Sequence, residues 1–483
     1  MNLRKFVVSD NISGMDLGLN SSVFLFGFIG VILLPFYIYV FGAGILWEYM
    51  GVLIAMVVVW NFEGYRLMRY ARKHHDIISL PGYFSRRFSE KHDYIRVISA
   101  CEIIILTALI DSLILKEGGI IISTVTGLSE GTAKIVIMLF VAFLFYMFGY
   151  KSLQKSAVYK GTFFLIIVLA LGVYMYTRYG GLQLIRNMMQ TDITGSVSEY
   201  LNFFFHDGKL LQPGDYVSLI SMGMLAGGMP YMLSGFFIAK DSDTVTNGKR
   251  IVIVYIISFV VLGAVMGAFS RGYIYFAKIE QSLSGYVKLM TDTMIGDGAL
   301  GIVAAILYMT MIVIGLESTI EACFQVCVAS IYEDILRKGR ILRVRKRYEK
   351  MTLLIIVISL AVAMLILSEC ISSFSINTII FFIGALGCSI MPTVFMSLVW
   401  RRMNRFGCVA GLLVGVISVP FFKYASVFVS GDGKAALCDI LGINAVIPSM
   451  LFSFGFIILV SLITPAPAKP IVDEFNDVRN RIA

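Results

Sequence analysis

The chain has 483 residues, of which 58% are hydrophobic and only 15% are charged, whereas a soluble protein normally carries about 25% charged residues. This composition excludes a soluble protein and predicts an integral membrane protein. The formal net charge of +9 does not indicate a nucleic-acid partner, because most of the basic residues lie in alternate loops between apolar segments.

The apolar segments are long enough for membrane-spanning helices, each of which needs roughly 20 mainly apolar residues. On that criterion we predict an all-α membrane protein with about twelve spans, forming a single domain over residues 1–483. In chain order they lie at approximately 22–42, 46–63, 97–123, 133–150, 157–177, 216–238, 250–276, 298–332, 351–369, 373–400, 406–424 and 444–464.

The loops alternate in charge, in agreement with this number of spans. The segments 64–96 and 333–350 each contain eight Lys and Arg residues, whereas 43–45 and 370–372 contain none. Lys and Arg concentrate in cytoplasmic loops. An even number of spans therefore predicts a plasma-membrane protein with both termini in the cytoplasm, including the tail at 465–483.

The first and sixth predicted spans are interrupted by helix-breaking residues. The first contains Gly27, Gly30 and Pro35, and the sixth contains Gly223, Gly227, Gly228, Pro230 and Gly235. Each of these residues alone can serve helix packing. However, corresponding interrupted helices in two halves of a chain are typical of inverted-repeat transporters with a binding site at the bilayer midplane. We therefore expect a transporter, with Gly228 and the aromatic Tyr231 in contact with its solute. Packing in the protein core is the alternative for Tyr231.

The eighth predicted span has polar residues at its centre. Glu317 and Glu321 are one helical turn apart and flank the hydroxyls of Ser318 and Thr319. Carboxylates at membrane depth are costly, and those that occur usually line a pathway. This pattern predicts a site for a cation, a proton or a polar solute.

Other classes of membrane protein lack their motifs here. The sequence has no G-x-x-x-x-G-K-[ST], H-E-x-x-H or G-x-S-x-G stretch, which argues against an ATP-driven pump and against common membrane enzymes. All four histidines fall in predicted loops, and the seven cysteines include no C-x-x-C pair. We therefore expect no enzyme activity, no zinc site and no cofactor other than a sodium ion.

Four segments resemble the sodium:solute symporter family, and most closely its proline-permease branch. They are RLMRYARKHHDIISLPGYFSRRF at 66–88, GMPYMLSGFFIAKDS at 228–242, ASIYEDI at 329–335 and PTVFMSLVWRRMNRFGCVAGLLVG at 392–415. The resemblance implies a LeuT-type fold with a five-plus-five inverted repeat. The expected units are a first repeat at 22–177, an inverted second repeat at 216–400 and two additional helices at 406–464.

The resemblance also implies a sodium site between the first and eighth helices. Backbone carbonyls at Val23 and Phe26 and the carbonyl of Gly315 would supply ligands, together with the hydroxyls of Ser318 and Thr319. The residues themselves agree with this, because oxygen ligands suit a hard cation. Alternatively, the two hydroxyls only hydrogen-bond to their own helix.

The chain departs from the family pattern in its acidic residues. Two family acids, one in the first helix and one near the start of the fifth, fall on Leu25 and Val158. Conversely, Glu317, Glu321 and Asp111 stand where the family is usually apolar.

Three interpretations of these added carboxylates remain open. They replace the missing acid in binding a cation or proton, they complement a polar or cationic solute, or they form a structural ion pair, for example with Lys116.

The sequence therefore predicts a secondary transporter that couples the uptake of a small organic solute to sodium. Proton coupling is the alternative, because the added carboxylates could titrate. A protein of a different class, a transporter-derived sensor or structural membrane protein without transport, is favoured by the lost acids and by the short segment ahead of the first helix. The retained hydroxyl pair and helix-breaking glycines argue for transport.

Overall fold

The computed structural model describes residues 12–22, 25–74, 77–89, 93–191, 196–274, 282–338, 348–371, 376–429 and 433–480. These residues are almost entirely helical, and the strands among them form two small antiparallel hairpins. The first hairpin pairs Phe205 with Leu210, and the second pairs Ser426 with Ala436.

The long helices lie at the positions of the predicted spans, and the strands lie between them. The elements of the N-terminal half are α2 (Gly14–Asn20), η1 (Leu25–Leu33), α3 (Leu34–Phe41), η2 (Ala43–Ile45), α4 (Leu46–Val58), η3 (Val59–Glu63), α5 (Gly64–Lys73), α6 (Leu80–Arg87), α7 (Tyr94–Thr126), α8 (Glu130–Tyr179), α9 (Gly181–Thr191), α10 (Val197–Tyr200), β1 (Phe205–His206) and β2 (Lys209–Leu210). Those of the C-terminal half are α11 (Pro213–Met224), η4 (Leu225–Gly228), α12 (Pro230–Ser234), η5 (Gly235–Ile238), α13 (Ser242–Tyr273), α14 (Leu283–Gly296), α15 (Ala299–Ala329), η7 (Ser330–Lys338), α16 (Glu349–Cys370), α17 (Ile376–Val399), α18 (Arg405–Tyr424), β3 (Ser426–Val429), β4 (Gly433–Ala436), α19 (Leu437–Leu441), α20 (Val446–Ile463) and α21 (Lys469–Asn480).

Within the described residues, ten helices are long and apolar enough to cross a membrane, or up to eleven if one bent pair counts as a span. The bent pair is Pro213–Gly228 with Pro230–Ile238, and its halves meet at 43°. The remaining predicted span corresponds to a shorter apolar helix, Gly27–Phe41. The twelve predicted segments therefore all coincide with apolar helices, and two of the twelve are shortened or bent.

Both interrupted helices break at the predicted glycine-rich positions. The backbone of Gly27 within η1 is not helical, with φ −76° and ψ −111°. Met229, between η4 and α12, is extended with φ −75° and ψ 122°, because Pro230 disfavours a helical conformation for the residue before it. A break leaves backbone carbonyls free of helical hydrogen bonds, which makes them available to ligands.

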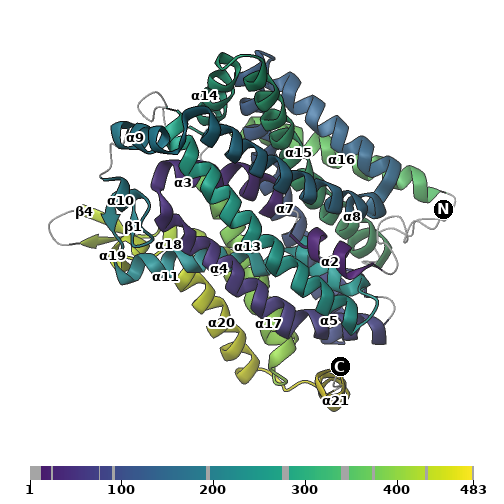
Figure 1. Cartoon of the computed structure of the whole chain (residues 1–483). Coiled ribbons are helices and arrows are strands. Elements are labelled where there is room, and N and C mark those ends of the chain that lie inside the picture. The colour runs from purple at the N-terminus through teal and green to yellow at the C-terminus, as the bar shows by residue number, and fades with distance from the viewer. Residues whose placement is uncertain are drawn as a thin grey trace.

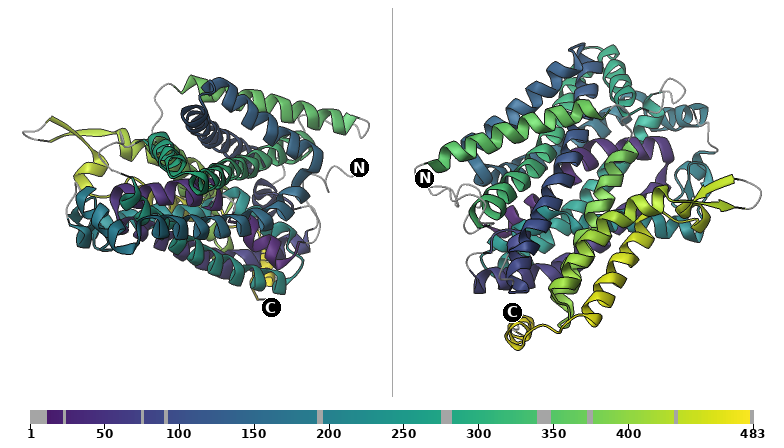
Figure 2. Two further views of the ribbon diagram at one scale, coloured as in Figure 1. Left: turned by 45° about the horizontal axis from the view of Figure 1, so that its top comes forward. Right: turned by 180° about the vertical axis from the view of Figure 1, so that it is seen from behind.

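The helices form one bundle whose two ends differ (Figure 1). We call the end at which α5, α6 and α21 lie the basic end, because it bears the Lys- and Arg-rich segment 64–96. The opposite end bears α9, α10, α14 and both hairpins. The helices α18 and α20 run beside each other along one edge of the bundle (Figure 2).

The surface around the bundle is apolar, as a lipid-facing surface must be. Leu139, Ile166 and Leu459 are each more than half exposed, whereas the aromatic rings of Trp60, Tyr83 and Phe145 are fully buried in the interior. Exposed apolar side chains that cover several spans are typical of contact with lipid.

Candidate functional site

The break in η1 lies directly against α15 near the middle of the bundle. The backbone N–H of Phe28 donates a hydrogen bond of 2.8 Å to Oγ1 of Thr319. The hydroxyl of Thr319 in turn donates to the carbonyl of Gly315 at 3.2 Å. A Cβ atom at Gly27 would collide with both Oγ1 of Thr319 and the carbonyl oxygen of Gly315. Only glycine therefore permits this approach of the two helices.

Two of the residues predicted for the cation site, Gly315 and Thr319, thus meet at the break. Gly315 and Thr319 face the η1 break, whose backbone includes Phe26, and Thr319 is fully buried. Both hydroxyls donate to carbonyls of their own helix, as the alternative interpretation describes, Ser318 to Ile314 at 2.6 Å and Thr319 to Gly315 at 3.2 Å. Thr319 differs in that it also accepts a hydrogen bond from Phe28 of η1. Val23 lies outside the described residues.

Glu317 and Glu321 form a buried ion-pair triad with Lys160 of α8. The ammonium of Lys160 lies 2.6 Å from Oε2 of Glu317 and 3.0 Å from Oε2 of Glu321. The side chains of the two glutamates are only 5% and 2% exposed, respectively. Two carboxylates against one ammonium leave a net charge of −1 when all three groups are ionised.

One carboxylate oxygen of this triad has no hydrogen-bond partner. Oε1 of Glu317 is buried and unpaired, and Oε2 of the same residue lies 3.4 Å from the hydroxyl of Ser318. A buried carboxylate oxygen without a partner is costly unless a cation or a proton completes it. The triad adjoins the η1 contact, because Ser318 and Thr319 stand between the two glutamates on α15.

The sequence did not identify Lys160 as the ion-pair partner of the two glutamates, for which Lys116 was the residue considered. Lys116 donates a hydrogen bond to the carbonyl of Ile371 and is not paired with either glutamate. Lys160 lies in the first turn of the predicted span 157–177 and within α8. A basic residue inside a predicted span was the available signal, but its proximity to α15 was not visible in the sequence.

The predicted solute residues Asp111 and Tyr231 gather around α15 as well. Asp111 of α7 is 1% exposed, and neither of its carboxylate oxygens has a hydrogen-bond partner. The helices that carry Asp111 and Tyr231, α7 and α12, both pack against α15. Gly228 lies on the opposite side of the α12 break and packs closely against Gly387 of α17.

The basic end of the bundle is closed by buried polar contacts. Asp334 of η7 accepts a hydrogen bond of 2.8 Å from Ser79 and pairs with Arg96 at 3.5 Å. The hydroxyls of Tyr83 and Ser397 lie 2.9 Å apart. These contacts join α6, α7, η7 and α17.

The C-terminal helix α21 packs over the basic end. Lys73 pairs with Asp477 at 2.6 Å, and His74 lies 2.5 Å from Glu474. The guanidinium of Arg87 stacks over the ring of Phe475 at 4.8 Å. The helix therefore links the closed end to the segment that follows α20.

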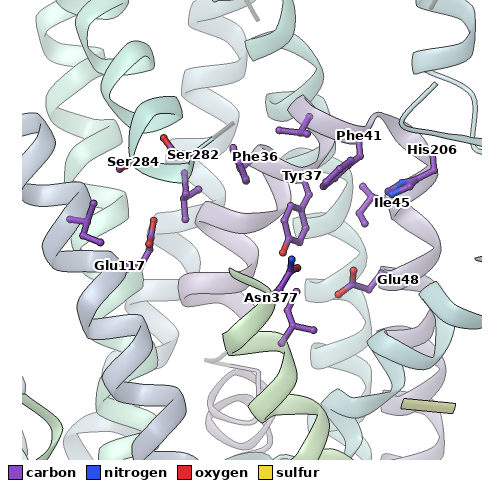
Figure 3. Close-up of a pocket in the computed structure, with 14 residues that line it drawn as sticks. Phe36, Tyr37, Phe41, Ile45, Glu48, Glu117, His206, Ser282, Ser284 and Asn377 are labelled. Atoms are coloured by element: carbon purple, nitrogen blue, oxygen red, sulfur yellow. The ribbon is translucent and has the colours of Figure 1, made fainter. Parts of the chain in front are cut away.

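The opposite end is hollowed by a cavity of about 580 Å³. Its walls come from α3, α4, α7, the start of α14 and α17, and Figure 3 shows Glu48 and Glu117 among the side chains that point into it. We call this cavity the vestibule. The bundle is thus open at one end and closed at the other.

Sequence relatives of the chain are named as transporters. It is 21% identical over 438 residues to the high-affinity proline transporter PutP of Bacillus subtilis (strain 168), covering 90% of this chain and 87% of that protein. It is 24% identical over 458 residues to a sodium/proline symporter of Staphylococcus aureus (strain JH9), covering 92% and 84%.

Solved structures share the fold across nearly the whole chain. A Na⁺-coupled sialic acid symporter in a substrate-bound outward-open state matches with a TM-score of 0.73 at 12% identity, covering 96% of this chain and 93% of that one. MhsT in complex with L-phenylalanine matches with a TM-score of 0.55 at 14% identity, covering 93% and 97%. The expected LeuT-type fold is therefore confirmed.

The family model described as the sodium:solute symporter family matches residues 6–415. This match extends from the segment before η1 through the first part of α18, so it includes both broken helices and the triad. The chain belongs to the sodium:solute symporter family.

Proposed function

We propose that the protein imports a small organic solute by alternating access and couples this movement to sodium. The observation that supports the proposal best is the η1 break at Gly27, pressed against Gly315 and Thr319 beside a buried triad of net negative charge. Carbonyl, hydroxyl and carboxylate oxygens at a broken helix are the ligands expected for sodium. The relatives named as sodium/proline symporters and the Na⁺-coupled neighbour support the same coupling ion.

The sodium ion would bind where Thr319 now bridges the two helices. The hydroxyl of Thr319 accepts a hydrogen bond from the N–H of Phe28 and donates one to the carbonyl of Gly315. A cation that takes the carbonyl of Gly315 as a ligand would replace the hydrogen bond between Thr319 and Gly315. The unpaired oxygen of Glu317 supplies the negative charge. Sodium would therefore hold η1 against α15 and stabilise one conformation of the bundle.

The charge of the loops supports one orientation of the bundle in the membrane. The basic end would face the cytoplasm, since Lys and Arg concentrate on that side. The vestibule would then open to the outside, and the contacts of Asp334 with Ser79 and Arg96 would form the closed inner gate. Solute would pass from the vestibule toward Asp111, Tyr231 and Gly228 before that gate opens.

Proton coupling is a second candidate, because the triad can accept a proton. Protonation of one glutamate beside Lys160 removes the net negative charge, as sodium binding would. The two ions are distinguished by the driving gradient.

The test is uptake of labelled solutes by proteoliposomes, with proline first because the relatives are named for it. An inward sodium gradient is compared with an inward proton gradient without sodium. Stimulation by sodium alone supports the proposal, and stimulation by the proton gradient that disappears in Glu317→Gln supports proton coupling. Absence of uptake under both gradients for every solute tried would favour a protein that has lost transport.

The site itself is tested with a matched pair of threonine variants on α15. Thr319→Ala removes a predicted ligand, and we expect the sodium concentration for half-maximal uptake to rise at least about tenfold. Thr310→Ala is the control, because the half-buried hydroxyl of Thr310 bonds, among the residues that the structure describes, only to the carbonyl of Ile306 of its own helix at 2.7 Å. Equal sodium dependence in the two variants would refute the assignment of Thr319.

A further inference from the structure

The vestibule has the dimensions and lining of a binding site for a small organic molecule. Its volume of about 580 Å³ lies within the roughly 300–1,000 Å³ of sites for small organic ligands. Three aromatic residues of α3, Phe36, Tyr37 and Phe41, form a row along one wall, with ring centroids 6.0 and 5.8 Å apart. A site for sodium alone needs a small cluster of oxygens rather than an aromatic wall.

Two carboxylates face this cavity without partners. Glu117 of α7 is only 4% exposed, and it makes no hydrogen bond or ion pair with any residue that the structure describes. Glu48 of α4 is likewise unpaired there and lines the other side of the cavity. In Figure 3 the two side chains stand on opposite sides, with the ring of Tyr37 between them.

Nothing in the described lining neutralises these carboxylates. No Lys or Arg is among the residues that the structure shows around the vestibule. His206 lies at the rim, stacked on Phe41 at 4.9 Å, and burial lowers its pKa, so its imidazole is neutral at pH 7. Lys134, the partner of Glu130 at 2.8 Å, is also paired with Glu369 and does not pair with Glu117. The vestibule is therefore acidic in a chain whose net charge is +9.

We infer that the vestibule is a binding site for a small organic cation, an amine or quaternary ammonium compound, held between Glu117 and Glu48 and against the aromatic rings of α3. The carboxylates provide the counter-charge, and ring faces attract organic cations most strongly where water is excluded. This inference deepens the proposed function, on which it rests, by naming the charge of the solute that enters from this end.

Binding to the purified full-length chain tests the inference. Choline and putrescine are the organic cations, proline is the zwitterion, and sodium chloride at equal ionic strength is the inorganic control. We expect calorimetry to detect the organic cations and to show at least about a tenfold weaker affinity in Glu117→Gln and in Glu48→Gln, because each variant removes a charged hydrogen-bond acceptor. Asp292→Asn is the matched control, since Asp292 is an exposed acid of α14 outside the cavity.

A second measurement does not depend on how well the glutamate variants fold. Ser284 lines the vestibule, so Ser284→Cys, in a chain whose exposed Cys101 and Cys370 are replaced by serine, should react with a cationic thiol reagent faster than with an anionic one. Choline should protect this cysteine.

The outcomes separate this inference from the proposed function. Binding of choline or putrescine that needs Glu117 and Glu48 supports the inference whether or not sodium drives uptake. Sodium-driven uptake of proline, with no binding of either organic cation and equal reactivity toward the two thiol reagents, would overturn the inference and leave the proposed function intact. Unchanged affinity in both glutamate variants would also overturn it.

Discussion

The contact between η1 and α15 makes a quantitative prediction about Gly27. In Gly27→Ala the new methyl group would overlap Oγ1 of Thr319 and the carbonyl oxygen of Gly315. The helices must separate, which costs about 1–3 kcal/mol for overpacking. The N–H of Phe28 then loses its 2.8 Å bond to Thr319 in a buried position, which costs about 1–3 kcal/mol more. We expect a total loss of about 2–6 kcal/mol in conformational stability.

The assay is thermal unfolding of the purified protein, with sodium-driven uptake measured in parallel. Gly172→Ala is the matched control, because nothing lies within 4 Å of a Cβ added there, and alanine in an open helical position is neutral or stabilising. The double variant Gly27→Ala/Thr319→Ala should lose less than the sum of the single losses, since removal of Oγ1 makes room for the methyl group. A melting temperature of Gly27→Ala equal to that of Gly172→Ala, or strict additivity in the double variant, would refute the reasoning.

Two further predictions concern buried charge. Lys160→Met leaves Glu317 and Glu321 without the ammonium that lies 2.6 and 3.0 Å from them, so it should lower the free energy of unfolding by about 3–5 kcal/mol. Adding Glu321→Gln to this variant should restore part of the lost melting temperature. A Lys160→Met protein as stable as the wild type would show that the triad is not buried in the membrane. Asp334→Asn weakens the contacts with Ser79 and Arg96 at the basic end. It should therefore raise the rate of solute exchange through that end about tenfold, measured as efflux from loaded proteoliposomes. An efflux rate equal to that of the wild type would exclude Asp334 from the gate.

Much of the fold could be predicted because it follows from local properties of the sequence. The length of each apolar run and the charge of each loop indicated the spans, and glycine and proline indicated the breaks at Gly27 and Pro230. The contact of Gly315 and Thr319 with the first helix was expected from the family resemblance. These features depend on residues that are close in sequence or on motifs shared by the family.

The partner of the two glutamates could not be predicted in this way. Lys160 is separated from Glu317 by 157 positions, and only the packing of α8 against α15 brings them together. The vestibule was missed for the same reason, because Glu48 and Glu117 belong to different helices and each resembles an acid at a membrane interface. Sequence periodicity identifies which residues are polar within a span, whereas tertiary packing decides which of them meet.

The triad also bears on the two acidic residues that the chain lacks. The family resemblance implies acids at the positions of Leu25 in η1 and Val158 in α8, and both elements pack against α15. Here the carboxylates lie on α15 instead, and an ammonium stands two residues beyond Val158. The local charge changes from −2 to −1, so attraction for a cation is reduced but not abolished. A weaker sodium affinity than that of transporters with both acids, rather than loss of sodium coupling, is the consequence that this rearrangement predicts.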